Sequence, residues 1–154
     1  MKILICGSRE FSDEHLLSTV LSGYAVGPGD VVIHGAARGA DVMGGRIARR
    51  RGAEVVEFPA DWKRYGKSAG YRRNEQMLDQ APEIVLAFFA GEFTAGTMHT
   101  VRLAQKRGIE VGVWGGPQGE PEPTVEPHDA CDCPDCDLWR EQREEWLERK
   151  ERQS

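Results

Sequence analysis

The chain has 154 residues, of which 40% are hydrophobic and 29% charged, and its formal net charge is −5. This size suits one hydrophobic core, and no stretch approaches the length of a membrane-spanning helix, so we expect no membrane partner. Residues 1–116 carry 15 Lys and Arg against 13 Asp and Glu, whereas residues 117–154 carry 5 against 12. Because nonspecific nucleic-acid binding normally needs a basic surface, this distribution disfavours a nucleic-acid partner.

Short apolar runs and amphipathic stretches alternate along the first 114 residues. Strands are predicted at residues 2–6, 30–34, 54–58, 83–89 and 110–114. Helices are predicted between them at residues 13–24, 39–51, 71–81 and 97–107, with Ser12 as the N-cap of the first. Since each parallel crossover needs a connection about as long as a helix, this order predicts an α/β fold with a Rossmann-like, doubly wound parallel sheet of about five strands.

The composition of the chain changes after Trp114. Residues 1–114 are predicted to form the Rossmann-like domain. Residues 115–127 are rich in Gly, Pro and Glu, which is typical of a linker. Residues 128–154 are predicted to form an acidic, cysteine-containing extension that ends in a charged helix.

Three glycine-containing turns each follow a predicted strand: GSRE at 7–10, GAARGAD at 35–41 and TAGT at 94–97. In open α/β sheets the ligand crevice lies at the carboxyl ends of the strands, where glycine allows close approach and the N–H groups that open a helix favour an anion. We expect the three turns to wall one nucleotide or phosphate pocket; the alternative is three sharp turns without a ligand. Asp41 is the weakest candidate, because it could simply complement the helix dipole. The candidate residues are Gly7, Ser8, Arg9, Gly35, Ala36, Arg38, Gly39, Asp41, Gly96 and Thr97.

Four segments of the chain, MKILICGSREF, HGAARGAD, YRRNEQML and GEFTAGT, together resemble the SLOG superfamily of Rossmann-like proteins, nearest to its small YspA-like branch. The resemblance covers residues 1–114. The superfamily also contains the Lonely Guy phosphoribohydrolases, which cleave the N-glycosidic bond of nucleoside monophosphates, and the DNA-binding DprA proteins. The resemblance implies a nucleotide or nucleotide-derived ligand, such as an ADP-ribose-like molecule, and does not by itself imply catalysis.

Arg73 is the sharpest single candidate. The Lonely Guy enzymes have an active-site arginine four residues before a methionine, and Arg73 and Met77 have that spacing. One helical turn puts both on one face, so Arg73 faces the sheet edge if Met77 packs in the core. A guanidinium group suits phosphate because it is a planar fork of donors that stays charged. The alternative is that Arg72 and Arg73 are solvated surface charges and Asn74 is a routine polar residue.

The third turn departs from the Lonely Guy pattern PGGxGTxxE. Gly96 and Thr97 match, but Thr100 stands where those enzymes have a catalytic glutamate. N-glycosidic cleavage needs a carboxylate, so we expect ligand binding, by a sensor or a sequestering protein, ahead of hydrolysis. The alternatives are a phosphoribohydrolase-like nucleotide hydrolase, with Arg73 as its catalytic candidate, and a single-stranded DNA-binding module. Other groups that could supply acid–base chemistry are Asp41, Glu75, Glu92 and His99.

The chain has four cysteines, and its start shows no cleavable signal pattern. We therefore expect a cytoplasmic protein whose cysteines are thiols or metal ligands. We also expect a homo-oligomer. Cys6 is predicted to be a small buried hydrophobe. His128, Cys131, Cys133 and Cys136 form H-x2-C-x-C-x2-C, a ligand set that suits structural zinc, although the spacing is tighter than in common zinc folds. The equal alternative is a disordered tail that happens to hold thiols. The core is expected to need no cofactor.

Overall fold

The computed structural model describes residues 1–116, 148 and 151–152. Five parallel strands form one sheet in the order β3-β2-β1-β4-β5. The strands are β1 (Lys2–Gly7), β2 (Val31–His34), β3 (Glu54–Glu57), β4 (Ile84–Phe88) and β5 (Glu110–Trp114). The helices are α1 (Glu14–Gly23), α2 (Ala40–Arg50), α3 (Trp62–Tyr65), α4 (Ala69–Asp79) and α5 (Ala95–Lys106), with a 3-10 turn η1 (Gly66–Ser68). The predicted α/β fold with a doubly wound parallel sheet is confirmed.

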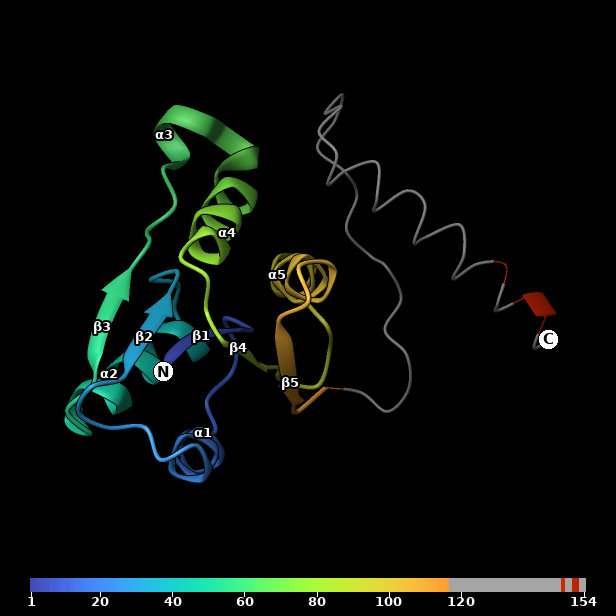
Figure 1. The fold of residues 1–154 in the computed structure, drawn as a ribbon. Coiled ribbons are helices and arrows are strands. Elements are labelled where there is room, and N and C mark those ends of the chain that lie inside the picture. The colour runs from blue at the N-terminus through green and yellow to red at the C-terminus, as the bar shows by residue number, and fades with distance from the viewer. Residues whose placement is uncertain (117–147, 149–150, 153–154) are drawn as a thin grey trace. The chain divides into compact units, whose positions relative to one another are not determined.

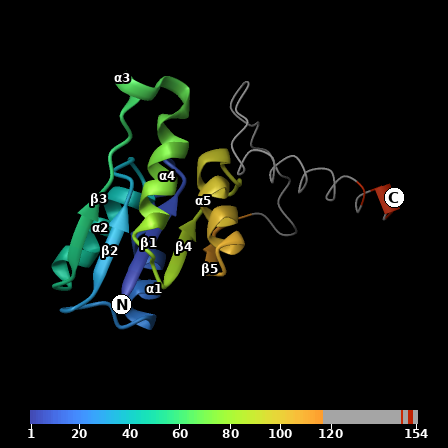
Figure 2. The same cartoon turned by 45° about the horizontal axis from the view of Figure 1, so that its top comes forward.

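Helices cover both faces of the sheet, with α1 and α2 on one side and α4 and α5 on the other (Figures 1 and 2). Successive side chains of a strand point to opposite faces, so Ile3 and Ile5 of β1 pack with the first pair of helices, whereas Leu4 and Cys6 pack with the second. Burial on both faces explains why β1 is a continuous apolar run. The Cys6 side chain is buried as predicted, and burial raises the pKa of its thiol.

The chain changes direction across the sheet between β1 and β4. It first runs outward from β1 to β3, then returns to place β4 on the other side of β1, with Ile3 opposite Ile84 and Gly7 opposite Phe88. A side chain on Gly7 would overlap the Phe88 carbonyl oxygen. In folds of this kind the ligand crevice lies at the carboxyl ends of the strands near such a reversal.

Two local predictions need correction. The N-cap of α1 is Asp13, whose carboxylate accepts a 3.0 Å hydrogen bond from the backbone N–H of Leu16, so the prediction of Ser12 was wrong. The segment 61–70, for which no helix was predicted, contains α3 and η1. Asp61 caps α3 by accepting a 3.1 Å bond from the N–H of Arg64.

The predicted linker and extension lie almost entirely outside the described residues, as do His128, Cys131, Cys133 and Cys136. Within residues 1–116, 148 and 151–152, no group of three or more His, Cys, Asp or Glu side chains could hold a metal ion. No helix in that part of the chain is long and apolar enough to span a membrane.

Candidate functional site

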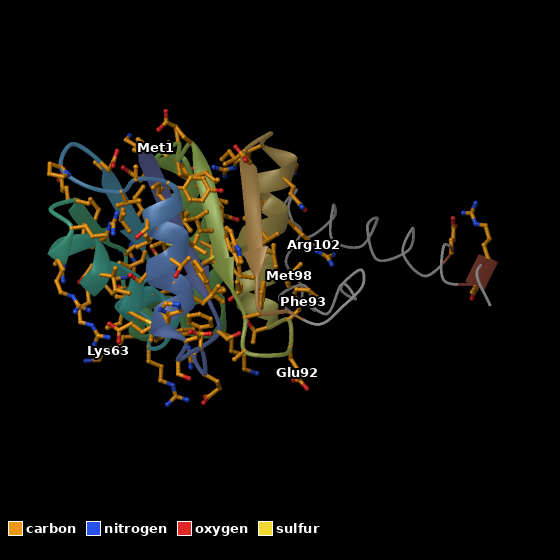
Figure 3. The ribbon with its side chains drawn as sticks, turned by 90° about the horizontal axis from the view of Figure 1, so that it is seen from below. Met1, Lys63, Glu92, Phe93, Met98 and Arg102 are labelled. Carbon is orange, nitrogen blue, oxygen red and sulfur yellow. The ribbon has the colours of Figure 1, made fainter. Side chains whose placement is uncertain are left out.

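A hollow of about 410 Å³ opens beyond the carboxyl ends of β1, β2 and β3, a size typical of small-molecule sites. Figure 3 separates the two ends of the sheet: Met1 marks the amino end, whereas Lys63 of α3 and Glu92 of the β4–α5 loop lie toward the opposite end. The residues that line the hollow come from the β1–α1 turn, the β2–α2 turn, the segment after β3, and α4. They are Arg9, Gly35, Ala36, Ala37, Arg38, Pro59, Ala60, Trp62 and Arg73.

Arg73 reaches the hollow from α4. Its Nη1 donates a hydrogen bond to the carbonyl oxygen of Gly35, and its Nε donates to Oδ1 of Asn74 at 3.0 Å. Met77, one turn further along α4, is only 1% exposed, so the predicted orientation of Arg73 toward the sheet edge is confirmed. Burial lowers the pKa of Arg73 and the charge of Asp41 opposes that shift; a guanidinium group remains charged under either influence. The hollow therefore contains a cation held in a fixed position.

Asp41 organises the β2–α2 turn from inside the protein. Its side chain is 5% exposed, and Oδ2 accepts hydrogen bonds from the backbone N–H groups of Gly35 at 2.9 Å and Ala37 at 3.4 Å. Burial raises the pKa of Asp41 to about 6, while the charge of Arg73 and the two N–H donors act in the opposite direction. Asp41 does not line the hollow; it fixes the backbone that does.

His34, the last residue of β2, also stabilises the β2–α2 turn. Its Nδ1 accepts a 2.9 Å hydrogen bond from the N–H of Ala36, a non-glycine residue with φ of 57°. Nε2 lies 3.6 Å from Oε1 of Glu57, too far for a hydrogen bond, and burial lowers the pKa of His34. His34 is therefore neutral at pH 7, with its proton on Nε2. His34 was not among the residues predicted from sequence; the available signal was a histidine that ends an otherwise apolar strand.

The first turn packs tightly against the start of α2. Ser8 is 3% exposed, and its Oγ accepts a 3.3 Å hydrogen bond from the N–H of Ala90. Gly39 has φ of 85°, and a side chain there would overlap the carbonyl oxygen of Ser8. Gly7, Ser8 and Gly39 therefore join neighbouring turns, whereas Arg9 is the residue of GSRE that lines the hollow.

The part of the chain that contains these turns is similar to known proteins. Residues 1–65 match the family described as "YspA, cpYpsA-related SLOG family", a stretch that contains the lining of the hollow except Arg73. The "Gene 61 protein" of Mycobacterium phage D29 is 39% identical over 117 residues, which cover 71% of this chain and 93% of that protein. This chain belongs to the YspA, cpYpsA-related SLOG family. The resemblance inferred from the sequence motifs is thereby confirmed.

In this SLOG domain the third turn does not line the hollow. Gly96 and Thr97 lie in the first turn of α5, and Figure 3 shows Phe93 of the β4–α5 loop well apart from Lys63 of α3. Asn74 links the two regions: its Nδ2 donates to the carbonyl oxygen of Gly96 at 3.1 Å. The structure thus brings two of the three predicted walls together, and it connects the third to Arg73 through Asn74.

Asn74 is itself buried, with 4% of its surface exposed. Its Nδ2 also lies 3.2 Å from Nδ1 of His99, a distance that suits a hydrogen bond if that nitrogen is unprotonated. The ring of Tyr71 meets the His99 ring edge-on, with centroids 4.6 Å apart. Asn74 therefore acts as a buried connection between α4 and α5.

The acid–base candidates of the SLOG domain are not among the residues that line the hollow. Thr100, at the position of the Lonely Guy glutamate, is 1% exposed in α5, and His99 is 3% exposed. No carboxylate is among the residues that line the hollow. Of the groups considered from sequence, those that do not line it are Asp41, Glu75, Glu92 and His99.

Four residues of the lining were not among the candidates from sequence: Ala37, which belongs to the second turn, and Pro59, Ala60 and Trp62. Pro59, Ala60 and Trp62 come after the end of β3, and all three line the hollow. Their contribution depends on how the chain turns after β3, which residue periodicity does not encode. The signal in the sequence was a tryptophan three residues after Pro59, in the polar segment that follows the third predicted strand.

Proposed function

We propose that this SLOG domain binds a nucleotide or nucleotide-derived ligand of the ADP-ribose type in the hollow, as a sensor or a sequestering protein. The observation that carries the proposal is the convergence of Arg9, Arg38 and Arg73 on one hollow of about 410 Å³ at the carboxyl edge of the sheet. Guanidinium groups bind phosphate through paired donors. Sheets of this topology bind ligands at this edge.

The three arginines differ in how firmly they are held. Arg73 is half-buried and anchored to the Gly35 carbonyl oxygen. Arg38 is 74% exposed and pairs at 2.9 Å with Glu10, itself 77% exposed. Because an exposed ion pair of this kind contributes little stability, Arg38 can exchange Glu10 for a phosphate at small cost. We infer that Arg73 supplies a fixed positive charge, while Arg9 and Arg38 adjust to the ligand.

Side chains, more than backbone N–H groups, are the anion-binding groups of this proposal. The N–H groups of Gly35 and Ala37 already donate to Asp41, that of Ala36 donates to His34, and that of Ala40 donates to the carbonyl oxygen of Ser8 at 3.4 Å. A donor that is already satisfied adds little when a ligand arrives. The β2–α2 turn therefore serves mainly as a rigid floor.

A binding role is favoured over the phosphoribohydrolase alternative by the composition of the lining. Cleavage of an N-glycosidic bond needs a carboxylate close to the sugar. The nine lining residues include three arginines and neither Asp nor Glu. Among the described residues, the lining of the hollow offers positive charge for a phosphate and no carboxylate that could activate water.

Calorimetry of the full chain with AMP, ADP and ADP-ribose tests the proposal. Arg9→Gln and Arg38→Gln should each weaken binding by about 1.5 to 3 kcal/mol, the usual value of a charge-assisted hydrogen bond. Arg50→Gln is the matched control, because Arg50 is also exposed (61%) and paired with an exposed glutamate, Glu14, but lies at the end of α2. Absence of binding by the wild type, or equal affinity in all variants, would refute the proposal.

A further inference from the structure

Trp62 presents its indole ring at the hollow. It is the first residue of α3, is 51% exposed and follows Pro59 and Ala60, which also line the hollow. Asp61 caps α3 at its N-terminus with a 3.1 Å hydrogen bond to the N–H of Arg64, so the backbone that carries Trp62 is held in place. What distinguishes Trp62 from other exposed apolar residues is that its ring lines the same hollow as Arg9, Arg38 and Arg73.

Within the described part of the chain, no aromatic ring or guanidinium group stacks on Trp62. The neighbouring Tyr65 differs: the guanidinium groups of Arg64 and Arg72 lie 5.2 and 4.5 Å from its ring centroid. Trp62 instead approaches the bare backbone of α4 at Gly70, where an added Cβ would lie 3.4 Å from Cη2 of the indole. This separation is an ordinary van der Waals contact, so the indole lies close beside this turn of α4.

We propose that Trp62 is the platform on which the base of the bound nucleotide stacks, while Arg9 and Arg38 contact its phosphate groups. This inference rests on the proposed function and narrows it to one ligand class. Planar bases stack on tryptophan with a substantial gain in affinity, and the same hollow offers cationic side chains for the charged end. The ligands are therefore nucleoside phosphates that carry an intact base, and sugar phosphates without a base bind weakly.

The test compares ADP-ribose with ribose 5-phosphate on the full chain. Wild-type protein should bind ADP-ribose more tightly, and Trp62→Leu should weaken ADP-ribose binding by at least about five-fold, the lower end of base–aromatic stacking. The same variant should leave the affinity for ribose 5-phosphate unchanged, and Trp62→Phe should keep most of the affinity for ADP-ribose. Binding of ADP-ribose should also change the tryptophan fluorescence of the wild type and much less that of Trp62→Leu.

Tyr65→Leu is the matched control, since Tyr65 lies in the same short helix but does not line the hollow. It should bind both compounds as the wild type does. If Trp62→Leu keeps wild-type affinity for ADP-ribose while Arg9→Gln loses it, the stacking proposal is wrong and the proposed function stands. If the wild type binds neither compound, both are overturned. Because Trp62 is half exposed, its replacement should leave the thermal unfolding transition close to that of the wild type.

Discussion

Arg73 on α4 donates a hydrogen bond to the backbone carbonyl oxygen of Gly35, the residue that follows β2. The bond joins the helical layer on one face of the sheet to the turn that leads into α2 on the other face. The N–H of Gly35 donates to the buried carboxylate of Asp41. Gly35 therefore binds the cation of the hollow through its carbonyl oxygen and the carboxylate that fixes the turn through its N–H.

Gly35→Ala should disrupt this arrangement. A Cβ at position 35 would overlap Nη1 of Arg73 and lie 2.9 Å from Oδ2 of Asp41. Overpacking of this kind costs about 1 to 3 kcal/mol, and displacement of Arg73 should also weaken ligand binding. Urea unfolding and calorimetry measure the two effects. Gly96→Ala is the control, because no atom lies within 4 Å of the added Cβ; equal stability of the two variants would contradict the prediction.

Asp41 should make stability depend on pH in a defined direction. Its pKa is about 6 in the folded protein against the ordinary 3.8, so between these pH values the folded state keeps a proton that the unfolded chain has lost. The contribution of Asp41 is therefore fully present below about pH 4 and is lost as the pH rises through 6. Relative to Asp41→Asn, the free energy of unfolding of the wild type should fall by about 2 kcal/mol between pH 4 and pH 7. A constant or rising difference in urea titrations would exclude this.

Turnover of nucleotide ligands should be absent or slow. Thr100 occupies the position of the Lonely Guy glutamate and is buried, and the lining of the hollow contains no carboxylate. The full chain incubated with AMP and ADP-ribose should return both unchanged when the mixture is separated by chromatography. Repeated release of free base, abolished in Arg73→Met, would establish the hydrolase instead.

Zinc in the extension stays a prediction from the sequence. His128, Cys131, Cys133 and Cys136 supply the ligand types of a structural site. Elemental analysis should give about one zinc per chain in the wild type and none in Cys131→Ser/Cys136→Ser. The double variant should still bind ADP-ribose if the core works independently of the metal. Zinc-free wild-type protein would refute the site, and loss of ligand binding in the double variant would refute the separation of roles.

The sheet and its helices could be predicted because their signals are local. Each strand contains a short apolar run, and each long helix repeats its apolar residues at helical spacing. These elements can therefore be recognised within about a dozen residues. The orientation of Arg73 was accessible for the same reason, since Met77 one turn away marks the buried face of α4. The N-cap of α1 was misplaced by one residue because Ser12 and Asp13 are both good caps.

The residues that line the hollow were harder to predict from the sequence. The sequence shows that the three turns follow strands, and so lie at the same edge, but it does not show which turns face one another. β4 and α5 lie on the β5 side of β1, whereas Arg9, Gly35 and Trp62 gather on the β2 and β3 side. TAGT was therefore grouped with the other turns by its glycine and its strand, although the hollow does not include it.

By itself, the sequence determined the α/β class, the number and order of the strands and of the four long helices, and the edge of the sheet at which the turns lie, because these follow from residue periodicity and from the geometry of parallel crossovers. Only the tertiary structure decided the pairing of Arg73 with Gly35, the burial of Asp41 against two N–H groups, and the position of Trp62 at the hollow. These are contacts between segments far apart in the chain or between side chain and loop backbone. Their formation depends on how the layers pack, which no local pattern records.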